Sequence, residues 1–222
     1  NAMKKKIQHI ILIVLLGTIS ISAHASYILI PMDMSQKNHL KAYGVAYFAV
    51  SNSIDISWLL NYRGGSFMSP YNPSIENECV VRDVSYQVIA DIQADVIRQE
   101  IASVDANMNE IKLTKAPKIA VYSPKSKLPW DDAVTLVLTY AEIPYDVIYD
   151  EEVITGMLPK YDWLHLHHED FTGQYGKFWA NYRNASWYIE DVNTQEAMAA
   201  KLGFKKVSQM KLAVAKGIRD FV

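Results

Sequence analysis

A pattern of strand, apolar helix and strand in the second half of the chain constrains the fold most. Residues 118–124 read Lys-Ile-Ala-Val-Tyr-Ser-Pro, which is typical of a buried strand that runs into a loop. Residues 133–143 predict an apolar helix that Pro144 ends, and residues 145–149 and 161–167 predict two further strands. Strands and helices that alternate at this spacing indicate βαβ units. We therefore predict an α/β fold with a mostly parallel sheet and helices on both faces.

Two of these elements are expected to form the core of that fold. The strand over residues 161–167 is apolar enough to be central in the sheet. The helix over residues 133–143 is apolar nearly all round, so we expect it to be deeply packed, with Leu136 in the core. The last apolar helix ends at Val222 without a following strand, and the sheet is therefore expected to continue in a longer chain.

The first half of the mature chain also alternates between strand and helix patterns. Thr114-Lys115-Ala116-Pro117 reads as a join between two parts. We therefore divide the chain into an N-terminal α/β half, residues 26–115, and a second α/β half, residues 116–222, which is expected to be incomplete.

The first 25 residues are expected to lie outside the folded core. Asn1-Ala2 precedes Met3 as in a tag remnant, and three lysines then precede an apolar run over residues 10–16. Ala23-His24-Ala25 has the small-x-small pattern of a cleavage site, so we predict a cleaved signal peptide and an exported protein, periplasmic or extracellular. A membrane anchor is the alternative, but the apolar run is short for a spanning helix.

Charge and cysteine content narrow the classes of partner. Cleavage of the signal peptide would remove three lysines and change the formal net charge from −2 to −5. An acidic protein is a poor binder of polyanions, so we expect neither nucleic acid nor a membrane surface as a partner after cleavage. Cys79 is the only cysteine, so no internal disulfide can form. Acidic neighbours would raise its pKa, and we predict a packed structural residue.

A cluster of ionisable residues follows the strand over residues 161–167. His165, His167, His168, Glu169 and Asp170 lie within six positions of the chain. Alternation along a strand places His165 and His167 on the same face, and ligands of open α/β sheets bind at the carboxyl ends of strands. We predict His167 and Glu169 as proton-transfer groups, and His165, His168 and Asp170 as ligand-binding groups.

Two other segments contribute candidate binding residues. Trp130 and Asp131 follow the strand over residues 118–122 and are expected at the same edge of the sheet as the histidines. Arg63, Gly64 and Gly65 follow another predicted strand, and their backbone N–H groups could cradle an anion. An ordinary tight turn is the alternative for the two glycines.

Residues 174–188 are dense in aromatic side chains. We consider a lid or an aromatic pocket beside the histidines, and, as the alternative, an amphipathic helix with an aromatic core stripe.

Three segments together resemble a family of exported bacterial proteins. They are Ala120 to Pro124, Trp130 to Leu138, and the histidine-rich run from Tyr161 to Phe171. The chain resembles proteins that carry the label "asparagine synthetase B", over essentially all of its mature length. The resemblance implies a class I glutamine amidotransferase-like, flavodoxin-like domain in the C-terminal portion. In such domains a nucleophilic Cys follows a strand, and here that elbow is expected beyond Val222, because Cys79 comes far too early.

Three hypotheses of function remain open at this point. The first is a binding or hydrolytic role on a small polar substrate at the strand ends of an amidotransferase-like fold, in a chain that alone is expected to be inactive as an amidotransferase. The second is a metal-dependent hydrolase that uses His165, His167 and Glu169, since imidazole and carboxylate ligands suit zinc. The third is a non-enzymatic subunit that binds another envelope component. We favour the first, predict no cofactor and no metal, and leave the oligomeric state open.

Overall fold

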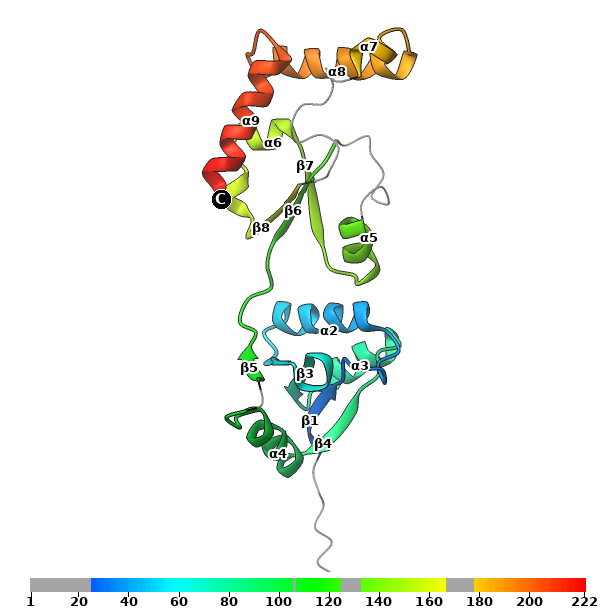
Figure 1. Cartoon of the computed structure of the whole chain (residues 1–222), viewed down its shortest axis with the longest axis vertical. Coiled ribbons are helices and arrows are strands. Elements are labelled where there is room, and N and C mark those ends of the chain that lie inside the picture. The colour runs from blue at the N-terminus through cyan, green and yellow to red at the C-terminus, as the bar shows by residue number, and fades with distance from the viewer. Residues whose placement is uncertain (1–24, 106, 125–132, 167–177) are drawn as a thin grey trace, which may run out of the picture.

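The computed structural model describes residues 25–105, 107–124, 133–166 and 178–222 and contains two sheets joined by a short connection (Figure 1). The signal peptide predicted over residues 1–25 lies almost entirely outside this part of the chain. The first sheet and its helices comprise β1 (Ala25–Ile30), α2 (His39–Ser51), β2 (Ser57–Leu60), the 3-10 helix η1 (Tyr62–Gly64), β3 (Ser66–Pro70), α3 (Pro73–Val81), β4 (Gln87–Ala90), α4 (Asp91–Ile101) and β5 (Asn109–Lys112). The second sheet and its helices comprise β6 (Ile119–Tyr122), α5 (Ala133–Tyr140), β7 (Tyr145–Ile148), α6 (Asp150–Ile154), the 3-10 helix η3 (Leu158–Lys160), β8 (Trp163–Leu166), α7 (Trp179–Tyr182), α8 (Ser186–Lys201) and α9 (Val207–Phe221).

The first sheet has five strands in the order β4-β1-β3-β2-β5, and all of its neighbouring strands are antiparallel. Helix α2 connects β1 to β2, and α3 connects β3 to β4. Strand β3 thus lies between the two strands of a β-α-β unit, which is the ferredoxin-like, split β-α-β arrangement. Strand β5 adds a fifth strand beside β2.

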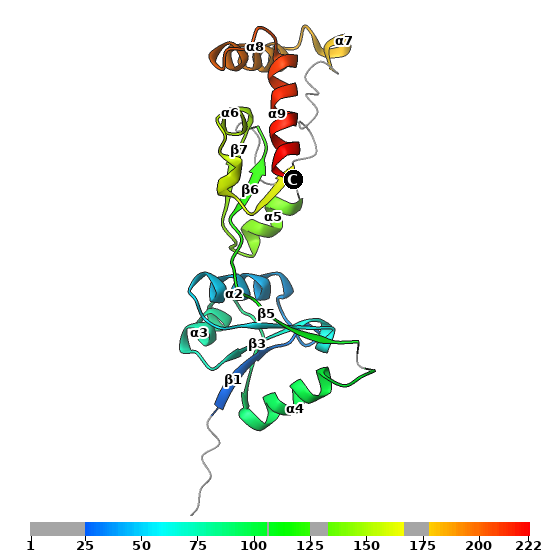
Figure 2. The same ribbon diagram turned by 90° about the vertical axis from the view of Figure 1, so that its left-hand side faces the viewer.

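Both faces of this sheet are buried because successive side chains of β1 point in opposite directions. Ile28 and Ile30 pack with residues of α2 and α3 in one cluster. Leu29 packs instead with residues of α4, among them Ala94 and Ile97, in a second cluster. The sheet is therefore covered by α2 and α3 on one face and by α4 on the other (Figure 2).

The predicted α/β class is confirmed, but a mostly parallel sheet is wrong for the first half of the chain. Residues 25–112 hold an antiparallel sheet, because β2 and β3 are joined by the short turn over residues 61–65 rather than by a helix. A parallel pair needs a crossover of about a dozen residues or more, and five residues allow only a hairpin.

The second sheet is parallel and has three strands in the order β7-β6-β8. Strand β6 pairs with both neighbours, in registers that align Tyr122 with Ile148 and with Leu166. All four residues of β6 are buried, as expected for the middle strand of a parallel sheet. The carboxyl ends of the three strands therefore lie level with one another at one edge.

The prediction that the strand over residues 161–167 is central is wrong within the described part of the sheet. Strand β8 lies at its edge, and β6 occupies the middle. Leu164 and Leu166 nevertheless pack against a cluster that contains Val214 and Ile218 of α9. Strand β8 is thus apolar because α9 covers one of its faces, and not because it has a strand on each side.

Helix α5 is less buried than predicted. Thr135 and Leu138 are buried, whereas Leu136 is 52% exposed and Val137 is 40% exposed. An apolar sequence all round the helix therefore does not mean burial all round, because only one stripe of the helix faces its neighbours.

The two halves contact each other where α2 and α3 meet the end of α5. Arg82 Nη1 donates a hydrogen bond to the Ala141 carbonyl at 3.1 Å and pairs with Glu142 at 3.0 Å. Lys41 Nζ donates to the other oxygen of Glu142 at 3.0 Å. A Cβ atom on Gly44 would lie 1.9 Å from the Ala141 carbonyl oxygen, so this approach requires glycine.

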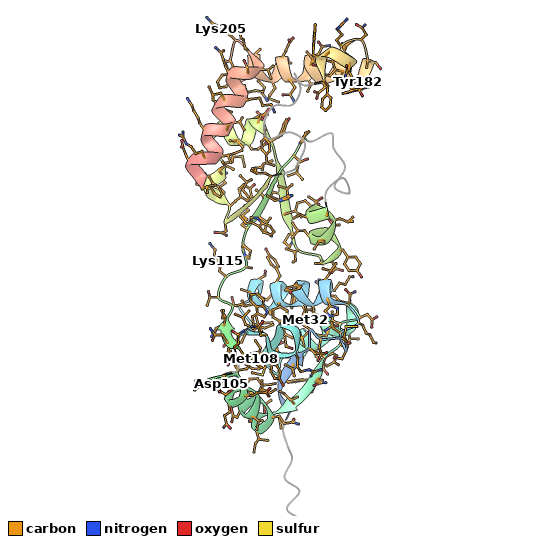
Figure 3. The ribbon with its side chains drawn as sticks, viewed as in Figure 1. Met32, Asp105, Met108, Lys115, Tyr182 and Lys205 are labelled. Atoms are coloured by element: carbon orange, nitrogen blue, oxygen red, sulfur yellow. The ribbon has the colours of Figure 1, made fainter. Side chains whose placement is uncertain are left out.

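The connection between the halves is held to both of them. The Tyr47 hydroxyl donates to the Pro117 carbonyl at 3.0 Å, and the Lys118 N–H donates to Asp162 Oδ2 at 2.9 Å. Lys115 forms an ion pair with the same carboxylate, and Figure 3 labels this lysine between the two sheets. The Lys115 and Lys118 hydrogen bonds together hold the pKa of Asp162 below its usual range.

Helices α7 and α8 extend from the end of the molecule farthest from the first sheet (Figures 1 and 3). In the part of the chain that the structure describes, no helix is long and apolar enough to cross a membrane.

Candidate functional site

The carboxyl ends of β6 and β7 form the floor of the candidate site. The Ser123 N–H donates to the Ile148 carbonyl at 3.0 Å, which keeps the two strand ends together. Tyr149 and Asp150 come directly after β7, and Asp150 begins α6. The Glu152 carboxylate accepts a hydrogen bond from the Tyr149 N–H at 2.9 Å. Asp150, Glu151 and Glu152 make up the first turn of α6, where the helix dipole favours acidic side chains.

Asp150 is a buried carboxylate with partners from two other elements. Its side chain is 1% exposed, and the Tyr122 hydroxyl donates to its Oδ1 at 2.5 Å. Lys211 Nζ on α9 lies 2.9 Å from its Oδ2, and the Lys211 side chain is only 7% exposed. Because a buried charge is tolerated only when it is compensated, Asp150 and Lys211 depend on each other.

The Tyr149 hydroxyl links this pair to α8. It accepts hydrogen bonds from Lys211 Nζ at 2.9 Å and from Gln195 Nε2 at 3.2 Å. Lys211 Nζ also lies 4.4 Å from the centre of the Tyr149 ring, and the rings of Tyr122 and Tyr149 are 5.1 Å apart. One network thus fixes the end of β6, the start of α6 and two later helices relative to one another.

A cavity of about 350 Å³ adjoins this network. It is lined by residues that follow β6 and β7 and by residues of α8, namely Pro124, Tyr149, Asp150, Glu151, Glu152, Asp191, Thr194, Gln195 and Met198. Its volume falls within the range of small-molecule sites, and the carboxyl ends of parallel strands are where such sites form.

Gln195 has a buried polar atom with no hydrogen-bond partner among the described residues. The residue is 6% exposed and its Nε2 is bonded to Tyr149, but its Oε1 is unpartnered. An unpaired buried polar group costs about 1–3 kcal/mol, and such groups are uncommon in folded proteins.

A larger hollow of about 520 Å³ lies along α8, but it is a weaker candidate. Every described residue that lines it comes from that one helix: Ser186, Ile189, Glu190, Asn193, Thr194 and Ala197. It is open to solvent on most sides, whereas specific small-molecule sites enclose most of the ligand surface.

His165 lies on the opposite face of the second sheet from Asp150 and Lys211. Tyr122, Leu164 and Leu166 pack toward α9 in one cluster. His165 alternates with the two leucines along β8 and therefore points to the other face. The structure thus places this predicted binding residue on a strand next to β6, but not in the network that surrounds Asp150.

Most of the other predicted site residues lie outside the described part of the chain. These are His167, His168, Glu169 and Asp170 after β8, and Trp130 and Asp131 before α5. Their roles stay predictions, as does the alternative of a metal site formed by His165, His167 and Glu169. In the residues that the structure describes, no group of three His, Cys, Asp or Glu side chains is arranged to hold a metal ion.

Arg63, Gly64 and Gly65 lie in the first half of the chain, in the turn between β2 and β3. Arg63 Nε donates to Asp33 Oδ2 at 2.6 Å, and this hydrogen bond holds the pKa of Asp33 well below its usual range. Gly64 has a φ of +81°, and a Cβ there would lie 2.4 Å from the Met32 carbonyl oxygen. These contacts account for both the arginine and the glycine as parts of a tight hairpin turn, and anion binding there stays a prediction.

The prediction that Cys79 is a packed structural residue is confirmed. Its side chain is fully buried in the cluster between α2, α3 and the first sheet. Burial, together with the nearby charges of Glu78 and Glu76, raises the pKa of the thiol from 9.0 to about 12. The thiolate that a nucleophile requires is therefore strongly disfavoured.

The aromatic segment is not a buried core stripe. Trp179 is 58% exposed, Tyr182 is 43% exposed and Trp187 is 53% exposed, while Tyr188 is buried. The Trp187 ring contacts the rings of both Tyr182 and Tyr188, with 5.3 Å between the centres of Tyr182 and Trp187.

The network around Asp150 was not predicted, although the sequence contains two signals for it. The run Tyr149-Asp150-Glu151-Glu152 follows a predicted parallel strand directly, which is where binding residues of open α/β sheets occur. Lys211 lies four residues after Val207 and three before Val214, so it falls on the apolar face of α9. A lysine at such a position requires a buried partner.

Comparison of the whole chain with known protein families, with curated proteins and with solved structures finds no match.

Proposed function

We propose that the second half of the chain is a doubly wound α/β domain that binds a small polar ligand in the cavity beside Tyr149, Asp150 and Gln195. The cavity of about 350 Å³ at the carboxyl ends of β6 and β7, which Tyr149, Asp150 and Gln195 help to line, is the observation that carries this proposal.

The order of the strands supports a doubly wound domain. The first strand in sequence, β6, lies in the middle, the second lies on one side of it and the third on the other. The flavodoxin-like order 2-1-3-4-5 begins in this way, and its ligands bind at the carboxyl ends of the strands where the order reverses. The class I glutamine amidotransferase-like character that the sequence resemblance implies is part of this proposal, as is the export of the protein.

The proposed role is binding rather than amidotransferase chemistry. Cys79 is buried in the other half of the chain with a raised pKa, so it cannot serve as a nucleophile at this cavity. If hydrolysis also occurs there, the sequence predicts His167 and Glu169 as its proton-transfer groups.

A thermal-shift screen with small polar compounds of cationic, anionic and neutral classes tests the proposal. We expect at least one class to raise the melting temperature of the wild-type protein, because a ligand that binds only the folded state stabilises it. Thr194→Trp would fill the cavity from α8 and should abolish the shift.

Glu196→Trp serves as the matched control, because Glu196 is exposed on the same helix and does not line the cavity. This variant should respond as the wild type does. A screen without a single stabilising compound, or a shift that survives in Thr194→Trp, would overturn the proposal.

A further inference from the structure

We propose that α8 is a movable wall of the cavity, which pivots at its C-terminal end and is held closed by two polar links. This inference rests on the proposed binding function of the same site. Helix α8 lies across the end of the second half, beyond the carboxyl ends of the parallel strands (Figure 1). It contributes one side of the cavity, and Tyr149 with the first turn of α6 contributes the other. A displacement of α8 would therefore open the cavity and leave the sheet unchanged.

Few side chains of α8 are buried. Tyr188, Gln195 and Ala199 are the buried residues among its 16, whereas the 15-residue helix α9 buries five. Trp187 and Ile189 of α8 are 53% and 46% exposed. A helix with few buried apolar side chains is displaced more readily than one that is packed in a core, so α8 moves more readily than α9.

The pivot lies where α8 joins α9. Ala199 and Leu202 at the end of α8 pack in a small apolar cluster with Val207 and Met210 at the start of α9. Gly203 in the connecting turn has a φ of +83°, and a Cβ atom there would meet nothing within 4 Å. The cluster keeps the two helix ends together, and the turn has open space in which its backbone angles can change.

Two polar links join α8 to the opposite wall. Gln195 Nε2 donates a hydrogen bond to the Tyr149 hydroxyl at 3.2 Å, and Lys201 Nζ pairs with Glu151 at 2.7 Å. Tyr149 and Glu151 both line the cavity, so each link crosses from one wall to the other. A half-turn of the Gln195 amide would keep the first link, because the Tyr149 hydroxyl would then donate to Oε1.

The two links differ in their leverage and in their sensitivity to salt. Gln195 lies about two helical turns from the pivot, whereas Lys201 lies in the last turn of α8. The hydrogen bond of Gln195 therefore opposes opening over the longer arm. The Lys201 and Glu151 side chains are 61% and 33% exposed, so salt weakens their ion pair and not the hydrogen bond.

Double electron–electron resonance between two nitroxide labels measures the position of α8. In a Cys79→Ala background, one label is placed at Glu190→Cys on α8 and the other at Lys160→Cys on η3, two exposed positions. Ser208→Cys on α9 with Lys160→Cys is the reference pair, because α9 and η3 belong to the same apolar cluster on the sheet. We expect one main distance for each pair when both links are intact.

Removal of the hydrogen bond should populate an open state. Tyr149→Phe keeps the ring, removes the hydroxyl and should raise the ratio of open to closed molecules about three- to tenfold. A second, different distance should then appear for the α8 pair only. Tyr145→Phe on the same strand is the control, because its hydroxyl bonds to Thr139 at an exposed position away from the cavity, and it should leave the ratio unchanged.

Removal of the ion pair should have a smaller effect. Lys201→Gln should raise the same ratio by up to about fivefold, and high salt should act in the same way. Lys112→Gln is the matched control, because this lysine is also 61% exposed in its pair with Asp55, and it should not change the ratio. Since Lys201 is exposed, its variant tests the proposal even if Tyr149→Phe fails to fold.

Two results would overturn the movable wall. One is an α8 distance that stays the same when Tyr149→Phe and Lys201→Gln are combined. The other is an equal change in the reference pair, which would mean that α9 leaves the sheet and not that α8 pivots. The measurement needs no ligand, so its failure would leave the binding function to the thermal-shift screen, and failure of the screen would leave the motion of α8 to this measurement.

Discussion

Lys211 on α9 and Asp150 at the start of α6 form a buried ion pair, with Nζ 2.9 Å from Oδ2 and the two side chains 7% and 1% exposed. The residues are far apart in the chain, and the pair ties the last helix to the carboxyl end of β7. Tyr122 and Tyr149 hydrogen-bond to the two members of the pair. Helix α9 therefore positions one wall of the candidate site.

The first prediction concerns this pair. Lys211→Met should lower the free energy of unfolding by about 3–5 kcal/mol, because it leaves the Asp150 carboxylate uncompensated in the interior. Lys37→Met is the matched control, since Lys37 and Asp83 form an ion pair with side chains 69% and 77% exposed. The control should cost at most about 1 kcal/mol.

Denaturant unfolding of both variants measures the difference. Adding Asp150→Asn to Lys211→Met should recover part of the loss, because the unpaired charge is then gone. Equal losses in Lys211→Met and Lys37→Met would mean that the Asp150–Lys211 pair is exposed to water in solution.

The second prediction tests the junction between the halves. Gly44→Ala would bring a Cβ atom to 1.9 Å from the Ala141 carbonyl oxygen, and this backbone atom cannot move aside without shifting α5. We expect a loss of about 1–3 kcal/mol, in spite of the better helix propensity of alanine. Hydrogen exchange at residues 141–143 should become faster.

Gly217→Ala in α9 is the control for the same substitution. Its new Cβ would lie 3.1 Å from Val153 Cγ1, which is the end of a side chain that can adjust. The gain in helix propensity, about 1 kcal/mol, should then offset the contact, and stability should change little. Unaltered exchange at residues 141–143 in Gly44→Ala would contradict the close approach of α2 and α5.

The third prediction distinguishes the two sides of α5. Leu138 is 5% exposed, so Leu138→Ala should cost about 2–5 kcal/mol through lost burial and the cavity left behind. Leu136 is 52% exposed, so Leu136→Ala should change stability by about 0.5 kcal/mol or less. Chemical denaturation of the two variants gives the comparison, and a larger loss in Leu136→Ala would mean that α5 is rotated about its axis.

The fourth prediction follows from the pKa of Cys79, which burial raises from 9.0 to about 12. Between these pH values the unfolded chain releases the thiol proton while the folded chain retains it. Stability should therefore be fully present below about pH 9 and should fall as the pH rises toward about 12.

Urea unfolding at pH 8 and pH 10 measures this change, with Cys79→Ala as the variant that lacks the thiol. The wild type should lose more stability than the variant over this interval, and an aromatic disulfide reagent should label Cys79 at pH 8 only in denaturant. Rapid labelling of the folded protein would contradict the burial of the thiol.

The sequence predicted the second half of the fold better than the first. Apolar runs, Pro144 and the spacing between strands identified β6, α5, β7 and β8, because a parallel sheet requires buried strands with crossovers between them. Strand direction in the first half was missed. The apolar pattern of a strand does not show which strand it pairs with, or in which direction. The five-residue turn with Gly64 and Gly65 was the one local sign of a hairpin.

The candidate site divides in a similar way. The sequence predicted a site at the carboxyl ends of parallel strands, formed mainly by the histidines after β8. Asp150, Gln195 and Lys211 come from three separate helices, and no local pattern shows that they meet. Burial alone distinguishes this Asp and this Lys from the many charged residues at the surface.

The sequence by itself therefore determined the α/β class, the packed Cys79 and the presence of a parallel unit, because these depend on local periodicity and composition. The tertiary structure decided the antiparallel first sheet, the edge position of β8, the exposed side of α5 and the buried Asp150–Lys211 pair. These features depend on contacts between segments that are far apart in the chain. The free energy of the whole packed structure decides which of these contacts form, and not the structural preference of any one segment.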